Sequence, residues 1–157
     1  MYIKSQFFED YVLNTVRTTL GRTITETDFV IHAGHTGDFF PHHMDAEWCK
    51  NQPFERRIAH GTMIFSISIG QTASEINPEA FSKGYDRLRF VKPVFIGDTI
   101  HSSVTISALT EDKKAGFGKV TEHVDVLNQH GEIVMVCDHI LLAKKKSIQA
   151  ENIGRAV

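Results

Sequence analysis

The stretch TMIFSISIGQTASEIN, residues 62–77, predicts a helix without a wide polar face. The polar positions in it are mainly small hydroxyl residues, and its large apolar residues are Met63, Ile64, Phe65, Ile67 and Ile69. A helix that is apolar on nearly all sides belongs inside a protein, surrounded by other elements. Gly70 and the β-branched residues are poor helix formers, so packing must stabilise this helix, and Pro78 limits its end.

Downstream of this helix, apolar residues recur with a period of two, which is typical of β-strands. In residues 85–92 the alternation places Tyr85, Arg87, Arg89 and Val91 on one face and Leu88 and Phe90 on the other. Further strands are expected at residues 100–108, 119–127 and 133–142, with a hairpin turn at residues 128–131. The last strand is apolar on both faces, as expected of a central strand. One buried helix followed by long antiparallel strands predicts an α+β fold in which the sheet wraps the helix.

The first third of the chain mixes extended and helical patterns. Residues 11–25 are rich in β-branched types and are expected to be extended. Thr25 with Asp28 three places later predicts the start of a short helix, because such a pair can satisfy free N–H groups. Two glycines and a proline predict a loop at residues 34–41, and residues 45–50 are expected to form one or two helical turns.

Length and composition bound the class of protein. The 157 residues are expected to form a single domain, residues 1–157, with an ordinary composition of 41% hydrophobic and 23% charged residues. A formal net charge of −2 offers no basic face for nucleic acid. We expect neither a signal peptide nor a membrane span, because charges interrupt the start of the chain, and Asp138 and His139 interrupt the most apolar late stretch.

Cysteine usage indicates the redox compartment. The two cysteines, Cys49 and Cys137, lie far apart and form no Cys-x-x-Cys pair. We therefore expect free thiols in a reducing compartment, and a cytoplasmic location.

A carboxylate and an imidazole lie five residues apart in the expected loop, namely Asp38 and His43. Gly37 and Pro41 can bend the chain so that both side chains face one cavity. Adding water to a double bond needs such a pair, since one group takes a proton from water and another gives one to carbon. By itself, the same spacing also fits an Asp that stabilises the loop and a His on the surface.

Three segments in the correct order extend this pattern. GHTGDFFPHHMD at residues 34–45 resembles the hydratase motif Gly-Asp-x-Asn-Pro-(aliphatic)-His-x-Asp of the MaoC-like and (R)-specific enoyl-CoA hydratase family. IAHG at residues 58–61 is similar to the family's Ala-His-Gly segment, and RFVKPVFIGDT at residues 89–99 is similar to its Arg-Phe…Pro-Val…Gly-Asp-Thr segment. The resemblance covers nearly the whole chain and implies a hot-dog fold, in which a curved antiparallel sheet wraps a long central helix.

The resemblance also implies an activity and its residues. The activity is reversible addition of water to the double bond of a 2-enoyl thioester, with coenzyme A as part of the substrate and no separate cofactor. Asp38 and His43 are the implied catalytic pair around one water, and the backbone N–H of Gly61 is the implied donor to the thioester oxygen. Free N–H groups and the dipole at a helix start favour the negative charge that develops there. Two sheets joined edge to edge imply a homodimer or a larger assembly of dimers.

One position departs from the family motif. The family's Asn falls at Phe40, and its aliphatic residue falls at His42. In the family this Asn helps to position the reacting groups, and a phenyl ring cannot make its hydrogen bond, so Phe40 bears on rate and substrate choice. His42 can supply the missing polar contact or face solvent, and solvent is favoured. The candidates for substrate binding are Phe40, His42 and His60.

Other readings of the same residues stay open. A histidine-rich stretch could suggest a metal, but no carboxylate or cysteine spacing completes a zinc pattern, so we expect none; its members are His32, His35, His42 and His43. The chain could instead hydrolyse thioesters, with Asp38 activating water on the carbonyl, or bind them without turnover. The basic residues that can meet phosphates of coenzyme A, or equally form solvated surface, are Arg56, Arg57, Arg87, Arg89 and Lys92.

Overall fold

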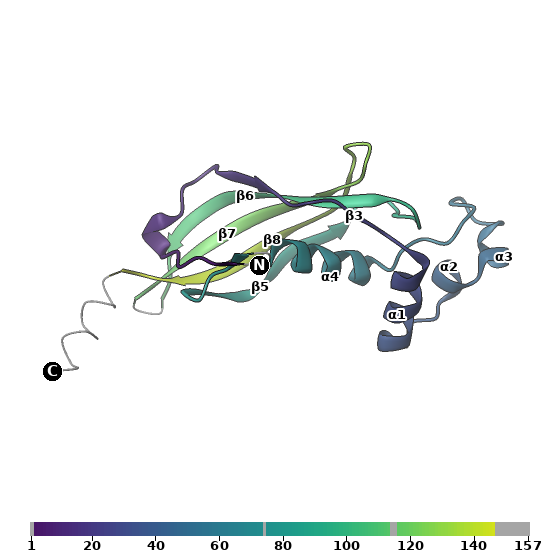
Figure 1. Ribbon diagram of the computed structural model, residues 1–157, viewed down its shortest axis with the longest axis horizontal. Helices are drawn as coiled ribbons and strands as arrows, with labels where there is room; N and C mark the ends of the chain where they lie inside the picture. The colour runs from purple at the N-terminus through teal and green to yellow at the C-terminus, as the bar shows by residue number, and fades with distance from the viewer. Residues whose placement is uncertain (1, 74, 114–115, 147–157) are drawn as a thin grey trace.

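In the computed structural model, a sheet of long strands forms most of the molecule, and helix α4 lies along it (Figure 1). The structure describes residues 2–73, 75–113 and 116–146. The helical elements are the 3-10 turn η1 (Phe8–Asp10), α1 (Glu26–Thr36), α2 (Pro41–Met44), α3 (Ala46–Cys49) and α4 (Gly61–Thr72). The strands are β1 (Tyr2–Ile3), β2 (Val16–Thr18), β3 (Arg22–Thr23), β4 (Glu75–Ile76), β5 (Ala80–Phe90), β6 (Thr99–Glu111), β7 (Phe117–Leu127) and β8 (Ile133–Lys144). Helices α1 to α3 gather at one end of the molecule (Figure 1).

The main sheet is antiparallel, with the strand order β2-β6-β7-β8-β5, and β3 also pairs with β6. β8 lies between β7 and β5, as the apolar pattern of its sequence predicts. The alternation expected for the two preceding strands is confirmed by their buried residues, which are Ile100, Ser102, Val104 and Ile106 on β6 and Val120, Val124 and Val126 on β7. The predicted α+β architecture is therefore confirmed, and the same period of two also buries Glu122 on β7.

Helix α4 supplies the centre of the core, as its apolar sequence predicts. Met63 and Ile64 are each 3% exposed and belong to one cluster with Val104, Val124 and Met135 of the sheet. Burying such a side chain contributes roughly 2 kcal/mol relative to leaving it in water. Packing against the sheet therefore stabilises a helix whose own residues are weak helix formers.

The predicted end of this helix, at residue 77, is wrong, because α4 ends at Thr72. The backbone after it forms β4, which pairs in parallel with β1 at the start of the chain. The side chain of Asn77 accepts a hydrogen bond from the N–H of Gln6 at 3.1 Å and donates one to the Gln6 carbonyl at 2.8 Å. Contact with the N-terminal segment thus ends the helix upstream of Pro78, the residue that the sequence predicted to limit it.

Strand β5 also departs from its predicted alternation. Its register with β8 shifts between Asp86 and Arg89, and Arg87 has a φ of 52°. The bulge lets Tyr85 and Leu88 both pack against the core, although a strict period of two placed them on opposite faces.

Helix α1 begins where the sequence predicts. Thr25 Oγ1 accepts a hydrogen bond from the N–H of Asp28 at 3.4 Å, and Asp28 Oδ2 accepts one from the N–H of Thr25 at 2.8 Å. The helix continues two residues past Gly34, which the prediction placed in a loop, and ends at Gly37 with a φ of 77°. The loop therefore shortens to residues 37–40, and a short helix, α2, takes up the rest.

Thr25→Ala is expected to lower the free energy of unfolding by about 1 kcal/mol, because it removes the side-chain oxygen that caps α1. Urea denaturation measures this change. The matched control is Thr27→Ala, at an exposed position in the same first turn, which should stay within about 0.5 kcal/mol of the wild type. An equal loss in both variants would show that the cap is not the cause.

Two further expectations concern the described residues. None of the helices in these ranges is long and apolar enough to cross a membrane. Cys49 and Cys137 are free thiols, as expected, and both are buried. Burial raises the pKa of Cys137 to about 11, so this thiol stays protonated at neutral pH.

Candidate active site

Two segments meet at the start of α4 and hold the expected catalytic loop there. The N–H of Ile58 donates to the carbonyl of His42 at 2.9 Å, and Nδ1 of His43 donates to the carbonyl of Ile58 at 2.7 Å. A third hydrogen bond runs from Nε2 of His60 to the carbonyl of Asp38 at 2.9 Å. These bonds tie the loop to the segment that leads into α4 and fix its position relative to the helix.

Asp38 turns one carboxylate oxygen toward His43. Its Oδ1 accepts a hydrogen bond from the N–H of Phe40 at 3.3 Å, which fixes the side chain to its own loop. Its Oδ2 lies 3.9 Å from Nε2 of His43. This gap is too long for a direct hydrogen bond, but a water oxygen about 2.8 Å from each atom fits across it. The structure thus brings the two side chains together around a space for one water.

His43 is buried, and its hydrogen bond determines which ring nitrogen faces Asp38. Because a carbonyl only accepts, the bond to Ile58 places a proton on Nδ1 and leaves a lone pair on Nε2 of the neutral ring. Burial lowers the pKa of His43, and His60 and His42 lower it further, which outweighs the opposing effects of the Ile58 carbonyl and Asp38. The ring is therefore neutral near pH 7 and can accept a proton from water at Nε2.

Gly61 is the first residue of α4 and provides a backbone donor at the same end of the helix. Among the residues that the structure describes, no group accepts a hydrogen bond from its N–H, as is usual in a first turn. The ring of Phe90 lies against this glycine so closely that a Cβ there would be 2.6 Å from ring atoms. The absence of a side chain therefore allows β5 to approach the helix start.

A cavity of about 460 Å³ opens beside His43 and Gly61, and Asp38 approaches His43 from outside its wall. His42, His43 and Gly61 form part of its wall. The apolar part of the wall includes Ile64, Phe90, Val94 and Val134. An apolar space with imidazoles and a helix start at one side suits a ligand with an apolar body and a polar reacting group.

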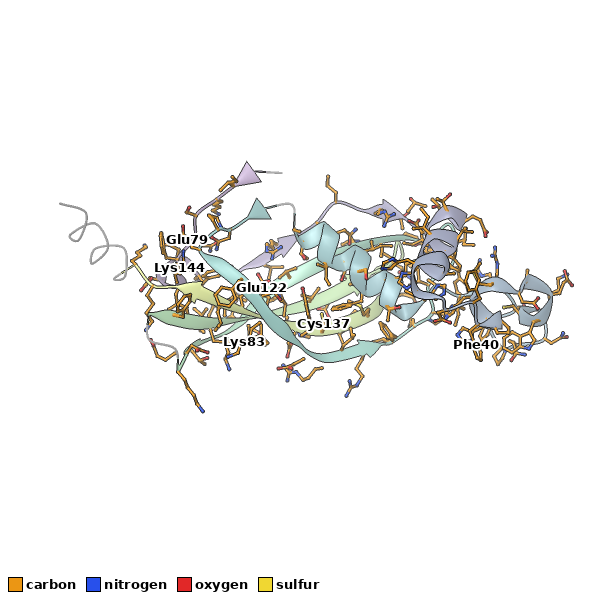
Figure 2. All side chains as sticks on the ribbon, turned by 90° about the horizontal axis from the view of Figure 1, so that it is seen from below. Phe40, Glu79, Lys83, Glu122, Cys137 and Lys144 are labelled. Carbon is orange, nitrogen blue, oxygen red and sulfur yellow. The ribbon has the colours of Figure 1, made fainter. Side chains whose placement is uncertain are left out.

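The three residues expected to bind substrate occupy different places. His42 is half-buried and lines the cavity, with its ring centroid 4.0 Å from that of His43, so it does not simply face solvent. Phe40 is 55% exposed and lies at the helical end of the molecule, outside the cavity wall (Figure 2). His60 is 1% exposed and stacks on His43 with ring centroids 3.7 Å apart. This position suits support of the His43 ring more than contact with a ligand.

The grouping of Asp38, His43 and His60 raises the question of a metal ion, since their ligand atoms lie within 4.8 Å of one another. The two imidazole planes are stacked at 24°, so their in-plane lone pairs run side by side and do not converge on one point. A metal needs ligand lone pairs that converge at about 2.0–2.2 Å. The arrangement therefore suits a proton-transfer pair with a supporting ring better than an ion.

The sequence did not reveal two contributors to this site. The carbonyl of Ile58 sets the protonated nitrogen of His43, and a backbone atom leaves no trace in residue types. The ring of Phe90 packs on Gly61 from another strand, and the only signal for it was the Arg-Phe pair in residues 89–99.

Comparison with known proteins identifies the family of this chain. The family model of the MaoC like domain matches residues 8–129. An (R)-specific enoyl-CoA hydratase from Rhodospirillum rubrum is 30% identical over 108 residues, which are 69% of this chain and 74% of that protein. The X-ray structure of a monoamine oxidase regulatory protein from Archaeoglobus fulgius superposes with a TM-score of 0.84 at 34% identity, covering 90% of this chain and 96% of that chain.

A further solved structure bears on the fold alone. It is a Mycobacterium tuberculosis protein with a double hot-dog fold, which superposes with a TM-score of 0.74 at 18% identity over 90% of this chain and 45% of that one. The hot-dog fold expected from the sequence is thus confirmed. The family model spans most of the chain, including the segments that carry Asp38, His43 and Gly61. The chain belongs to the MaoC-like dehydratase family.

Proposed function

We propose that the chain catalyses reversible addition of water to the double bond of a 2-enoyl thioester, with coenzyme A as the thioester carrier and no separate cofactor. The observation that carries this proposal is the 3.9 Å gap between Oδ2 of Asp38 and Nε2 of His43, beside an apolar cavity and the start of α4. Family membership supports the same class of reaction, since the relative from Rhodospirillum rubrum is named as an enoyl-CoA hydratase.

The proposed steps follow from the hydrogen bonds at the site. One water lies between the two side chains, and the carboxylate of Asp38 accepts one of its hydrogens. As the water oxygen bonds to the β-carbon, Nε2 of His43 takes the other proton, and the imidazolium then gives that proton to the α-carbon. The charge that builds on the thioester oxygen is stabilised by the N–H of Gly61 and the dipole of α4. The reverse steps release water.

The phosphates of coenzyme A require cations that are not already neutralised. Arg57, Arg87 and Lys92 each form an ion pair with a carboxylate. Arg56 stacks on an aromatic ring and Arg89 donates to a backbone carbonyl, and neither has a carboxylate partner within the described ranges. We therefore propose Arg56 and Arg89 as the residues available to the phosphates.

We also propose a homodimer that pairs along β5. This strand lies at an edge of the main sheet, and large apolar side chains on or beside it are exposed: Phe81 by 46%, Phe90 by 52% and Val91 by 52%. A second copy along this edge would pair its backbone groups and cover these side chains. Sedimentation equilibrium should give the mass of a dimer, and a monomer at all concentrations would contradict this proposal. The cytoplasmic location stays a prediction.

A screen of enoyl-CoA esters of increasing acyl length tests the activity. Hydration removes the absorbance of the enoyl double bond and releases no thiol, whereas thioester hydrolysis releases free coenzyme A, which a thiol reagent detects. We expect loss of absorbance without thiol release. Thiol release as the sole reaction would show that the protein is a thioesterase and not a hydratase. Saturable binding of the esters without either signal would show that it binds them without turnover.

Gly61→Ala is expected to lower kcat/KM for hydration about tenfold, which corresponds to about 1.4 kcal/mol. The new methyl group would lie 2.6 Å from atoms of the Phe90 ring, so this ring must move, and it forms part of the cavity wall. Initial rates below saturation measure the effect. Gly70→Ala in the same helix is the matched control, because a Cβ there meets nothing within 4 Å. Equal losses in both variants would argue against a local effect at Gly61.

A further inference from the structure

A second cavity lies at the other end of α4. Its volume is about 540 Å³, and Ile69 and Thr72 from the last turns of the helix form part of its wall together with residues of β5 to β8. It shares no wall residue with the cavity beside His43. Gly61 and Ile64 in the wall of the cavity beside His43 belong to the first turn of α4, whereas Ile69 and Thr72 belong to its last turn.

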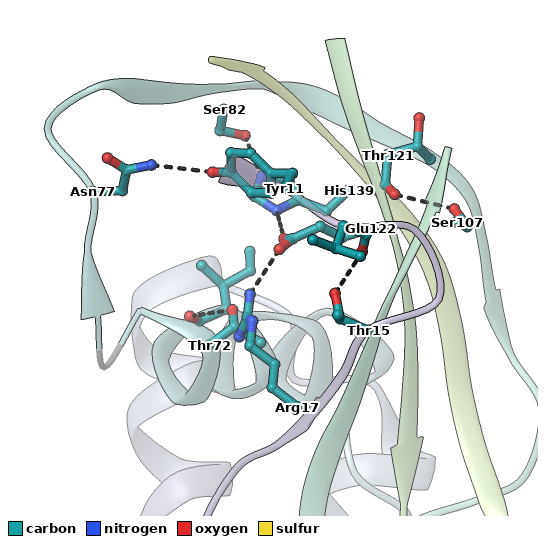
Figure 3. Close-up of polar contacts among 12 residues, drawn as sticks. Tyr11, Thr15, Arg17, Thr72, Asn77, Ser82, Ser107, Thr121, Glu122 and His139 are labelled. Atoms are coloured by element: carbon teal, nitrogen blue, oxygen red, sulfur yellow. Dashed lines mark hydrogen bonds and ion pairs between the residues drawn. The ribbon is translucent and has the colours of Figure 1, made fainter. Parts of the chain in front are cut away.

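Three side chains on the wall of this second cavity form a continuous hydrogen-bonded chain (Figure 3). Oγ of Ser82 lies 2.9 Å from Nε2 of His139, and Nδ1 of His139 lies 3.0 Å from Oε2 of Glu122. They come from the adjacent strands β5, β8 and β7, on which His139 and Glu122 are direct cross-strand partners. A hydroxyl, an imidazole and a carboxylate in this order can activate a serine as a nucleophile.

The carboxylate end of this chain is ionised. Burial by itself would raise the pKa of Glu122, but the hydrogen bond from His139, the charge of Arg17 and the hydrogen bond from Arg17 outweigh it and hold the pKa below its usual value. Oε1 of Glu122 binds Arg17 at 2.9 Å, which leaves Oε2 for His139. Because an ionised carboxylate only accepts, Nδ1 of His139 donates, and Nε2 of the neutral ring accepts the proton of the Ser82 hydroxyl.

The imidazole is held rigidly while the hydroxyl is accessible. The ring of Tyr85 stacks on His139 at an angle of 9° with centroids 4.5 Å apart, and Phe65 packs edge-on against Tyr85. Only 14% of the His139 side chain and 5% of that of Glu122 are exposed. Ser82 is exposed in the single chain and lies on the cavity wall, where an incoming carbonyl carbon can reach it. Its side chain points to His139 across the face of the sheet, whereas pairing of a second copy along β5 would use the backbone groups of the edge.

We propose that Ser82, His139 and Glu122 form a second catalytic site, which hydrolyses esters of short aliphatic acids through an acyl-serine intermediate. Oγ of Ser82 bonds to the carbonyl carbon as Nε2 of His139 takes its proton. The bond from that carbon to the alkoxy oxygen then breaks, and His139 gives the proton to the leaving alcohol. Water, which loses a proton to the same nitrogen, cleaves the acyl-serine bond, so that the acid leaves and the hydroxyl is restored.

The cavity wall determines the class of ester. Apolar side chains that can surround a short acyl chain are Ile69, Val104, Ile106 and Leu141. The hydroxyl of Tyr11, also on the wall, accepts a hydrogen bond from Nδ2 of Asn77 at 3.1 Å, and its own proton can serve the carbonyl oxygen. An ester with a short acyl chain therefore matches the site.

A fluorophosphonate probe tests the nucleophile in the full chain. The probe forms a covalent bond with an activated serine hydroxyl and leaves ordinary surface serines unmodified. Mass spectrometry of the digested protein is expected to find the added mass on Ser82. The proposal would be overturned if the added mass is not found on Ser82, or if it is found only on another residue.

Hydrolysis of 4-nitrophenyl butyrate tests turnover. Ser82→Ala is expected to lower kcat/KM for this ester by at least about a hundredfold. Circular dichroism should show an unchanged fold, because the replaced hydroxyl is at an exposed position. Ser107→Ala, at another exposed serine whose Oγ donates to the carbonyl of Thr121, should keep the wild-type rate (Figure 3). Equal rates for the wild type and Ser82→Ala, or no wild-type rate above that of buffer, would overturn the proposal.

Discussion

Asp38→Asn is expected to lower kcat for hydration of an enoyl-CoA ester by at least about a hundredfold. The amide oxygen can still accept the hydrogen bond that Oδ1 accepts from the N–H of Phe40, so the loop should keep its shape. The amide nitrogen takes the place of the oxygen that faces His43, and it has no lone pair for a hydrogen of the water. The water between the two side chains thus loses one of its two acceptors. Initial rates at saturating substrate measure the change.

The control for this variant is Glu47→Gln on α3. Its carboxylate is exposed and forms a surface pair with Lys50, so its loss should leave turnover unchanged. The melting temperature of Asp38→Asn should stay close to that of the wild type. Near-wild-type turnover in Asp38→Asn would end its assignment as a catalytic residue.

The elements that the sequence predicted well are those whose buried positions follow from the pattern of apolar residues within one segment. Met63 and Ile64 are buried because α4 has no polar face to turn outward, and that property is complete within residues 62–77. The alternation of apolar and polar residues in β6 and β7 likewise predicted which positions are buried, since each strand has one face against the core. In both cases a local pattern contains the information that the fold uses.

The elements that were predicted wrongly depend on partners far away in the chain. Asn77 leaves the helix because its side chain bonds Gln6, a contact between residues 71 positions apart. The bulge in β5 lies where the side chain of Arg87 forms an ion pair with Asp138 of β8. No pattern within residues 62–77 or 85–92 indicates either contact.

The same distinction applies to the sites. The motif at residues 34–45 singled out Asp38 and His43, but the nitrogen that faces the water depends on the carbonyl of Ile58, 15 positions away. Ser82, His139 and Glu122 have no motif at all, because three strands bring them together only after the sheet has formed. Sequence patterns therefore identify chemistry within a loop more readily than chemistry across a sheet.

His43→Ala is expected to lower kcat for hydration by at least about a hundredfold, because it removes the nitrogen that takes the proton from water. In the wild type, kcat/KM should be level near neutral pH and should fall only below the ordinary histidine value of about 6.5. The sign follows from burial, which lowers the pKa of His43, so that Nε2 becomes protonated and inactive as a base only at lower pH. A pH profile of initial rates below saturation measures this limb.

The alanine variant also loses the hydrogen bond to Ile58 and the stacking on His60, so it should be less stable. His43→Asn separates the two effects. Its side-chain amide can donate to the Ile58 carbonyl, as Nδ1 of the imidazole does, but it offers no nitrogen lone pair in place of Nε2. We expect the same loss of kcat with a smaller loss of stability. Recovery of turnover in His43→Asn would show that the ring acts by supporting the loop, and Asp38 would then have to activate the water without it.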